Sequence, residues 1–204
     1  MQFQGAPEQL LSSVTGVRVL RVLVSSPPCE LSGREIALRA RAPLPRVIER
    51  LHELAAQGVV TWRVAGRAHL WRLRPTHHLV APLAALFEAD RCARSDLRKE
   101  LETWVSARPG VLEARLFGSV GRGDDDARSD VDLFLLVRNR RDKAAATNAL
   151  PRLREAIRDR FGSNVHLVAR TQREASASPP PAFLAAARAE GIALAVGRPR
   201  AARQ

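Results

Sequence analysis

The sequence predicts an α+β protein built from two domains, and three observations carry that prediction. Residues 12–75 change from helical apolar spacing to alternating apolar spacing, which is typical of helices followed by a hairpin. Residues 109–197 hold short apolar runs and a long helical pattern, which is typical of a small α/β domain. The chain has 204 residues, enough for two small domains that each bury a core.

The first domain begins with three predicted helices. Apolar residues recur at helical intervals over residues 14–24, and a Pro-Pro pair ends that helix. A Ser-Gly-Arg-Glu run then has the spacing of a capping box and predicts a second helix over about 33–40. A third helix is predicted over 43–57, because proline is tolerated in a first turn and the glycine that follows is a natural stop.

A β-hairpin is predicted directly after the third helix. Residues 59–64 and 68–74 alternate in polarity and flank a short turn that contains Gly66 and Arg67. Three helices followed by a two-stranded ribbon form a winged helix-turn-helix. Residues 31–73 resemble the DNA-binding domains of bacterial and archaeal winged-helix regulators of the MarR or ArsR type.

That resemblance implies double-stranded DNA as a partner, with the third helix in the major groove and the wing on phosphates or the minor groove. Arg46 and Arg50 lie one helical turn apart on the predicted exposed face of that helix. Together with Arg67 at the wing tip they are the DNA-binding candidates. Alternatively, the two helix arginines form surface ion pairs with the glutamates three positions further along.

The rest of the chain is read as a connector, a second domain and a tail. Residues 76–108 predict one or two long helices, which either link the domains or pair with their copy in a homodimer. The α/β part predicts strands over 111–117, 130–138 and 164–169, helices over about 142–161 and 182–190, and a short apolar run over 192–196. The predicted divisions are therefore 12–75, 76–108, 109–197 and a disordered basic tail, 198–204.

The net charge of +12 favours a polyanionic partner, with nucleic acid as the first choice. Only two of the 33 basic residues are lysines, Lys99 and Lys143, so the arginine excess is also open to explanation by a GC-rich genome. No apolar run is long enough to cross a bilayer, and no secretory leader pattern precedes the first domain. We expect a soluble, cytoplasmic protein without a membrane partner.

Asp130 and Asp132 are predicted to bind a metal ion. Alternate side chains of a strand point to the same face, so these two carboxylates lie together while Val131 and Leu133 point to the other face. Two such carboxylates repel one another unless a cation neutralises them, and Mg²⁺ held by carboxylates and substrate phosphates is the usual arrangement. The alternative is a solvated acidic turn before an ordinary strand, although such a turn does not require an acid within the apolar run.

Gly118 and Ser119 stand at the end of the preceding apolar run and are suited to binding phosphate. A glycine lets the backbone approach a phosphate closely, and a serine offers a hydroxyl and an amide. Arg122 follows in the same glycine-rich bend and offers a cation to a triphosphate.

This Gly-Ser pair, the ten residues that follow it and the Asp-x-Asp pair resemble the signature of the DNA polymerase β-like nucleotidyltransferase superfamily, in the short form of the minimal nucleotidyltransferases. The resemblance covers about residues 111–168. It implies a small mixed sheet on which Gly118 and Ser119 hold the triphosphate of ATP or another NTP. Asp130 and Asp132 then hold the Mg²⁺ ions that assist in-line attack on the α-phosphorus.

The same resemblance implies a third carboxylate on a later strand, and this sequence departs from it there. The expected strand is 164–168, and Asn164 and His166 occupy the face that would carry the acid. His166 is either a weaker base or ligand, or a strand histidine hydrogen-bonded in place. Loss of the acid weakens deprotonation of the attacking hydroxyl more than nucleotide binding.

Three functions follow from these readings. The first is a DNA-binding nucleotidyltransferase that passes a nucleoside monophosphate to a protein or nucleic-acid hydroxyl, as an autoregulating antitoxin that modifies a toxin partner. The second is a winged-helix regulator whose nucleotidyltransferase-like domain senses nucleotide without turnover. The third assigns the basic surface to an RNA substrate and treats the helix-turn-helix as a scaffold.

Overall fold

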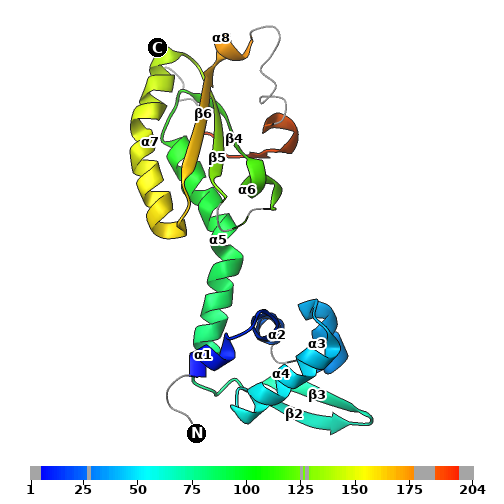
Figure 1. Ribbon diagram of the computed structural model, residues 1–204. Coiled ribbons are helices and arrows are strands. Elements are labelled where there is room, and N and C mark those ends of the chain that lie inside the picture. Colours follow the sequence, from blue (N-terminus) through cyan, green and yellow to red (C-terminus); the bar gives the residue numbers. More distant parts are fainter. Residues whose placement is uncertain (1–5, 27–28, 125, 127–128, 177–186, 198–204) are drawn as a thin grey trace. The chain divides into compact units, whose positions relative to one another are not determined.

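The computed structural model describes residues 6–26, 29–124, 126, 129–176 and 187–197 (Figure 1). The chain divides into two compact units, residues 1–92 and 93–204, and each is described by itself. Among the helices of the described ranges, none combines the length and the apolar character that crossing a membrane requires.

The first unit has the predicted order of three helices and a hairpin. The helices predicted over 14–24, 33–40 and 43–57 are confirmed, and the hairpin strands agree with the prediction to within a residue or two at each end. Two short elements were not predicted, a helix before the first predicted one and a two-residue strand. In chain order the elements are α1 (Ala6–Leu10), α2 (Val14–Val24), β1 (Leu31–Ser32), α3 (Gly33–Ala40), α4 (Leu44–Ala56), β2 (Val60–Ala65), β3 (Ala68–Leu73) and α5 (Val80–Ser106).

Side-chain caps start two of these helices. The Ser13 hydroxyl accepts a hydrogen bond from the backbone N–H of Gly16 at the start of α2. At the start of α3 the predicted capping box is confirmed, since Ser32 and Glu35 each accept a hydrogen bond from the other's backbone N–H. These bonds satisfy amide donors that a helix start leaves without partners.

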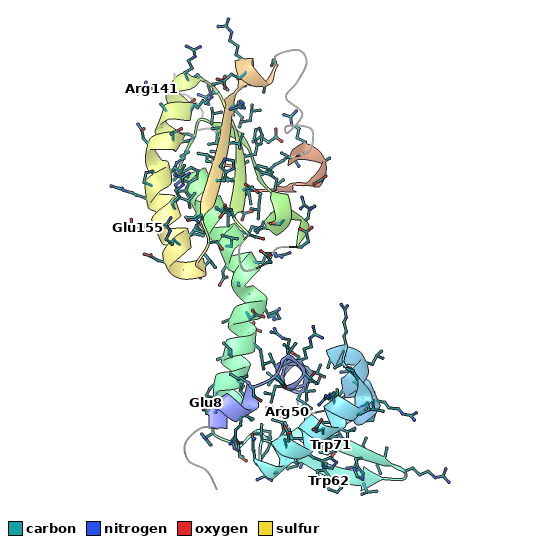
Figure 2. All side chains as sticks on the ribbon, viewed as in Figure 1. Glu8, Arg50, Trp62, Trp71, Arg141 and Glu155 are labelled. Carbon is teal, nitrogen blue, oxygen red and sulfur yellow. The ribbon has the colours of Figure 1, made fainter. Side chains whose placement is uncertain are left out.

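The sheet of the first unit is antiparallel, with strand order β1-β3-β2. Trp62 of β2 lies opposite Trp71 of β3 in register, and the two rings have different surroundings. Trp71 is fully buried in the helical core, whereas Trp62 is 45% exposed and stacks on His69 with 4.6 Å between ring centroids (Figure 2). Trp71 therefore anchors the hairpin in the helical core, whereas Trp62 meets α4 only at its surface, edge-on to His52.

One apolar core holds the first unit together. It joins α2, α3 and α4 to the hairpin and to the first half of α5. Its fully buried members include Val19, Leu20, Ile36, Leu51 and Trp71, and α5 contributes Val80, Leu83 and Phe87.

The second unit is built on a four-stranded mixed sheet with strand order β6-β5-β4-β7. Strand β5 is antiparallel to β4 and parallel to β6, and the short β7 is antiparallel to β4. The elements are β4 (Val111–Phe117), α6 (Gly118–Arg122), β5 (Val131–Val137), α7 (Arg140–Phe161), β6 (Val165–Thr171), α8 (Gln172–Ala175) and β7 (Ile192–Ala193). This small mixed sheet confirms the predicted α+β class.

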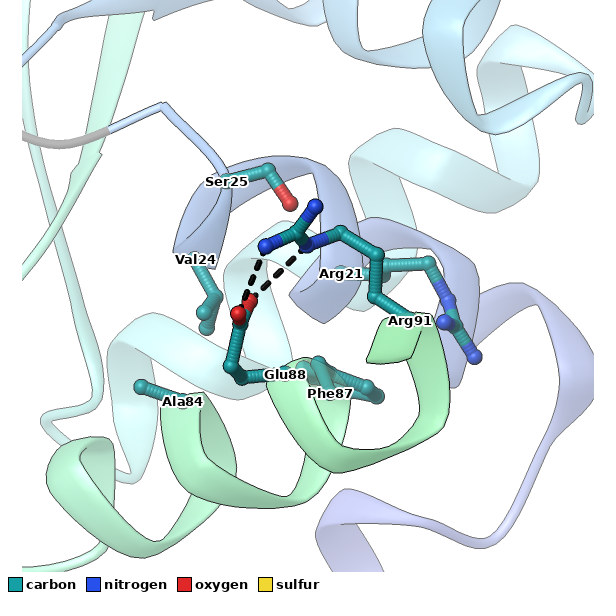
Figure 3. A pocket seen from close by; sticks show the side chains of 7 residues that line it. All are labelled: Arg21, Val24, Ser25, Ala84, Phe87, Glu88 and Arg91. Atoms are coloured by element: carbon teal, nitrogen blue, oxygen red, sulfur yellow. Dashed lines mark hydrogen bonds and ion pairs between the residues drawn. The ribbon is translucent and has the colours of Figure 1, made fainter. Parts of the chain in front are cut away.

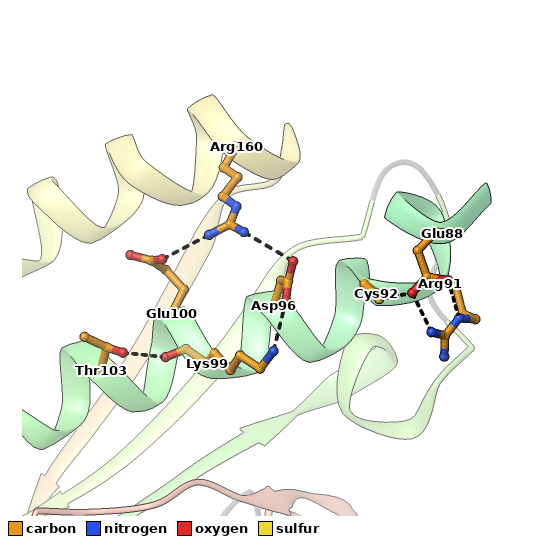
Figure 4. A network of polar contacts seen from close by, with 8 residues as sticks. All are labelled: Glu88, Arg91, Cys92, Asp96, Lys99, Glu100, Thr103 and Arg160. Atoms are coloured by element: carbon orange, nitrogen blue, oxygen red, sulfur yellow. Dashed lines mark hydrogen bonds and ion pairs between the residues drawn. The ribbon is translucent and has the colours of Figure 1, made fainter. Parts of the chain in front are cut away.

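Helices cover one face of this sheet. Leu97, Leu101 and Val105 of α5 and the apolar stripe of α7 pack on the inward side chains of β4 and β5. Arg160 of α7 also forms ion pairs of 3.2 Å with Asp96 and 3.5 Å with Glu100 of α5 (Figure 4). The opposite face carries a smaller cluster around Phe134 and Ala187.

Three predicted segments fall partly or wholly outside the described residues. The helix predicted over 182–190 is described only at 187–190, where the chain is helical. The loop predicted over 176–181 is described only at Ser176, and the predicted tail, 198–204, lies outside the described ranges.

Candidate functional site

The β5 strand places Asp132 between two neighbouring strands. Its register partners are Phe117, the last residue of β4, and His166 of β6. Val131 and Leu133 on either side of Asp132 are buried in the core, as the predicted alternation requires. Asp130 directly precedes the strand and is exposed. The Asp132 carboxylate therefore lies on the sheet face opposite the α5 and α7 helices.

His166 contacts Asp132 across the β5–β6 pairing. Its Nδ1 lies 3.2 Å from Oδ1 of Asp132, and the two side chains are 64% and 28% exposed. Parallel pairing puts the two side chains on the same face, which is why residues 34 positions apart meet here. The side chain of His166 thus lies on the same sheet face as Asp132.

Gly118 brings the predicted phosphate-binding turn against this carboxylate. It follows β4 directly, starts the short helix α6 and has a φ of +71°, in the left-handed region that favours glycine. A Cβ atom added to Gly118 would overlap Oδ2 of Asp132. Ser119 is the next residue of α6. The structure therefore brings together the Gly-Ser pair, Asp132 and His166. Residue spacing alone predicted only part of this arrangement.

The donor atoms at this place fit a hard cation. Carboxylate oxygens such as those of Asp132 are the ligands that Mg²⁺ prefers, and the close approach of Gly118 leaves backbone rather than a side chain next to that carboxylate. Asp130 precedes β5 by one residue and is exposed, and it offers a second carboxylate. Within the described ranges, no group of three or more His, Cys, Asp or Glu side chains is arranged to hold a metal ion by itself. Substrate phosphates would have to complete the coordination.

Arg122 has two acidic neighbours. Its Nε lies 3.3 Å from Oδ2 of Asp124, and its Nη1 lies 3.3 Å from Oε2 of Glu190. The hydrogen bond with Asp124 is the main cause that raises the pKa of Arg122. The contact with Glu190 was not predicted, because the two residues lie 68 positions apart and no local pattern links them.

The predicted DNA-binding arginines fall into two groups. Arg67 is exposed in the turn between β2 and β3, and Arg46 is exposed on α4 and pairs with Glu49 at 3.4 Å. Arg67 also borders a groove that lies between the wing and the starts of α3 and α4, opposite Arg34, Leu44 and Ile48. Arg46 and Arg67 are thus both on the surface of the first unit, as predicted.

The prediction that Arg50 lies on the exposed face of its helix is wrong. Arg50 is only 7% exposed, and its guanidinium donates to the backbone carbonyls of Gln9 and Leu10 and pairs with Glu53 (Figure 2). The cause is α1, an element that the sequence pattern did not reveal. The last backbone carbonyls of α1 lie against this face of α4 and accept hydrogen bonds from the arginine.

A pocket between α2 and the first half of α5 is lined by three charged residues, Arg21, Glu88 and Arg91, and each of them is paired. The guanidinium carbon of Arg21 lies 4.9 Å from the Phe87 ring centroid, and Arg21 pairs with Asp90, outside the pocket lining, at 2.6 Å. Arg91 pairs with Glu88 at 2.6 Å (Figure 3). The hydrogen bond from Arg91 lowers the pKa of Glu88 to about 2. The protein therefore satisfies these charges itself.

Comparison with solved structures gives distant likenesses to winged-helix regulators. ZitR of Lactococcus lactis, a zinc-responsive MarR family member, is 20% identical, with a TM-score of 0.35 over 45% of this chain and 60% of that chain. The PcaV transcriptional regulator of Streptomyces coelicolor is 21% identical, with a TM-score of 0.30 over 44% and 62%. NadR in complex with 4-hydroxyphenylacetate is 17% identical, with a TM-score of 0.35 over 50% and 84%.

This chain thus spans about 60% of the length of the first two regulators, and likenesses this weak carry no argument about function. No curated protein sequence matches the chain. A family model does match its second half, where the turn at Gly118 meets Asp132. Residues 96–182 match the family of the nucleotidyltransferase domain.

Proposed function

We propose that the protein is a DNA-binding nucleotidyltransferase that uses Mg²⁺ with ATP or another NTP. It transfers a nucleoside monophosphate to a hydroxyl of a protein or nucleic acid. The contact between Gly118 and Asp132, within the segment that matches the nucleotidyltransferase domain, is the observation that carries the proposal. It joins a phosphate-binding turn to a metal-binding carboxylate, which is the combination that nucleotidyl transfer requires.

Each residue of the site has a role in this proposal. Gly118 and Ser119 hold the triphosphate through backbone amide and hydroxyl. Asp130 and Asp132 hold Mg²⁺, which when bound neutralises phosphate charge and aligns the reacting groups. Arg122 adds a cation when phosphate oxygens replace one of its two carboxylate partners.

His166 is proposed to act on the attacking hydroxyl and on Asp132. One ring nitrogen faces Oδ1 of Asp132, so the histidine fixes the direction of that carboxylate. An imidazole nitrogen can accept the proton of an acceptor hydroxyl. Imidazole is a poorer Mg²⁺ ligand than the acid that the superfamily pattern implies on this strand, because Mg²⁺ prefers oxygen.

The first unit is proposed to bind double-stranded DNA through α4 and the wing. Arg46 and Arg67 are its phosphate- or base-contacting residues, and Arg50 is left out because it is buried. Binding to its own operator would make the protein autoregulating, and a toxin encoded nearby would be the protein substrate of an antitoxin. Pairing of α5 with its copy in a homodimer would present two helices to two half-sites.

A second function, nucleotide sensing without turnover, is favoured by one observation. His166 stands beside Asp132 in register, on the strand where the superfamily pattern implies a third acid, and neither Asn164 nor His166 is an acid. The site would then bind Mg-NTP and signal to the DNA-binding unit without passing on a nucleotide.

The test is incubation of the full chain with Mg²⁺, each α-labelled NTP, and protein, DNA and RNA acceptors. The variants are Asp130→Asn and Asp132→Asn, and the matched control is Glu155→Gln on the exposed side of α7 (Figure 2). Label transfer by the wild type and the control, but by neither Asp variant, supports the enzyme. NTP binding without any transfer overturns the enzyme in favour of the sensor, and absence of NTP binding overturns both.

The DNA-binding half of the proposal has its own test. Arg46→Ala and Arg67→Ala should each weaken binding to duplex DNA and reduce its salt dependence by about one counterion. Arg91→Ala, which removes an exposed arginine paired with Glu88, serves as the control. If Arg46→Ala and Arg67→Ala leave the affinity for duplex DNA unchanged, the assignment of α4 and the wing as the DNA-binding elements is overturned. Equal affinity of the wild type for RNA and duplex DNA favours the RNA-scaffold reading.

A further inference from the structure

Exposed arginines gather at the end of the second unit's sheet that lies away from Asp132. Strands β5 and β6 are parallel and end together, with Val137 opposite Thr171. Arg138 follows β5 directly, and Arg173 lies in α8 directly after β6. The α7 helix starts at the same end, as Figure 1 shows for α7 and α8. Three chain segments thus bring basic residues to one edge.

An ion pair ties two of these segments together. Nζ of Lys143, in the first turns of α7, lies 3.0 Å from both carboxylate oxygens of Glu174 in α8. Glu174 also caps α8 through the backbone N–H of Thr171. Arg140 and Arg141 precede Lys143, and Arg173 precedes Glu174, so the link holds the arginines of both helices at one place (Figure 2 labels Arg141).

The charge of these arginines is not neutralised within the described part of the protein. Arg138, Arg140, Arg141 and Arg173 are exposed and form no ion pair with a described carboxylate. Other arginines of the second unit do form ion pairs with described acids, but they lie outside this edge. They are Arg98, Arg115, Arg122, Arg160 and Arg188.

Neither of the two acids at this edge pairs with these arginines. Glu174 binds Lys143, and the carboxylate of Asp142 is turned inward against Gly110, where one of its oxygens is buried. Segments 138–143 and 170–174 hold six basic residues and these two acids. The edge therefore presents an uncompensated positive surface, to which the start of the long helix α7 adds its own partial positive charge.

We propose that Arg138, Arg140, Arg141 and Arg173 form a surface that binds the phosphodiester backbone of a nucleic acid. The guanidinium fork matches phosphate oxygens, and arginines from three segments can contact successive phosphates. Segments 138–143 and 170–176 hold no aromatic residue, so the surface contacts phosphates rather than stacked bases. Binding at this surface is therefore independent of base sequence.

The surface is separate from the proposed nucleotide site. Val137 is five residue steps along β5 from Asp132, which at about 3.3 Å per step is about 17 Å. A phosphate bound at Arg138 is thus too far from Asp132 to be the reacting one. The surface holds a polymer, whether as acceptor or as part of a larger complex, while the NTP occupies the other end of the sheet.

Salt dependence is the measurement that tests phosphate contact. The full chain is titrated with single-stranded RNA and with duplex DNA of unrelated sequence between about 50 and 200 mM salt, with anisotropy as the readout. All proteins carry Arg46→Ala and Arg67→Ala, so that the winged-helix site does not contribute. The test variant replaces three surface arginines, Arg140→Gln, Arg141→Gln and Arg173→Gln.

A matched control removes three charges from exposed arginines outside this surface, Arg91→Gln, Arg152→Gln and Arg160→Gln. We expect the slope of log affinity against log salt to fall by about 3 in the test variant and to stay unchanged in the control. Circular dichroism and thermal unfolding verify that both variants are folded. Because the nucleotide site is intact in both, their NTP binding should equal that of the wild type, whether or not the proposed enzyme activity exists.

Two results would overturn the proposal. Equal loss of slope in the test and control variants would mean that net charge alone attracts the polymer. Binding of polyglutamate as tight as that of RNA and DNA would mean that the surface takes any polyanion, with an acidic protein as an equal partner. Preference for RNA over DNA, or the reverse, identifies which nucleic acid the surface binds and supports the proposal in either case.

Discussion

Nη2 of Arg50 donates a hydrogen bond of 2.7 Å to the backbone carbonyl of Leu10, the last residue of α1. Arg50 also lies so close to Gly16 that a Cβ atom there would collide with its guanidinium. One buried cation thus joins α1, the start of α2 and α4. Its position explains why an arginine on a predicted DNA-reading helix is a structural residue.

The first prediction concerns this arginine. Arg50→Ala should lower the free energy of unfolding by about 2 kcal/mol, because charge-assisted hydrogen bonds to the carbonyls of α1 are lost. Arg46→Ala, one turn earlier and exposed, should change it by less than about 0.5 kcal/mol. Urea unfolding measures both. Equal stability of the two variants would contradict the buried contact.

The second prediction concerns Gly118. Gly118→Ala should weaken NTP binding by about tenfold or more, an energy of about 1.4 kcal/mol, because the new methyl group displaces the Asp132 carboxylate. Isothermal titration with Mg-ATP measures the loss.

Gly162 provides a matched control for that experiment. It has the same φ of +71°, at the end of α7, but a Cβ atom added there meets nothing within 4 Å. Gly162→Ala should therefore share the backbone strain of about 1–2 kcal/mol and leave NTP binding unchanged. If both variants bind NTP equally well, the contact between Gly118 and Asp132 does not shape the site.

The third prediction concerns metal dependence. ATP at about 100 times its Kd should stabilise the protein by about 2.7 kcal/mol in the presence of Mg²⁺. Chelation of Mg²⁺ with EDTA should abolish this stabilisation, and so should Asp132→Asn, because carboxylates and phosphates share the cation. Thermal unfolding followed by fluorescence measures the effect, and Glu155→Gln is the control that keeps it. If ATP stabilises the protein equally well in EDTA, nucleotide binding does not require Mg²⁺, and that part of the proposal is wrong.

The fourth prediction concerns pH. Hydrogen bonds from the Thr171 backbone and from Lys143 lower the pKa of Glu174 from its ordinary value of 4.5 to about 2. A depressed pKa in the folded state stabilises the fold above about pH 4.5, and this contribution is lost as pH falls towards 2. Glu174→Gln should therefore lose less stability than the wild type over that interval, as measured by urea midpoints. Parallel curves would show that Glu174 is not paired in solution.

Local patterns were sufficient where an element depends on its own residues. The Ser32–Glu35 capping box, the third helix and the hairpin strands were predicted close to their observed limits, because caps, prolines and apolar period act over a few positions. The two-residue β1 and the short α6 were missed, since elements of that length show no period. The prediction that Arg50 is exposed was wrong for a different reason. The burial of Arg50 depends on its contact with α1, forty residues away in the chain.

The sequence by itself determined the α+β order of elements, the spacing of Gly118, Asp130 and Asp132, and the absence of an acid at position 166. Only the tertiary structure decided which of these groups meet. Parallel pairing of β5 and β6 brings His166 to Asp132, and the turn after β4 brings Gly118 against the same carboxylate. Side-chain burial and contact across strands depend on packing between distant segments, which no local pattern contains.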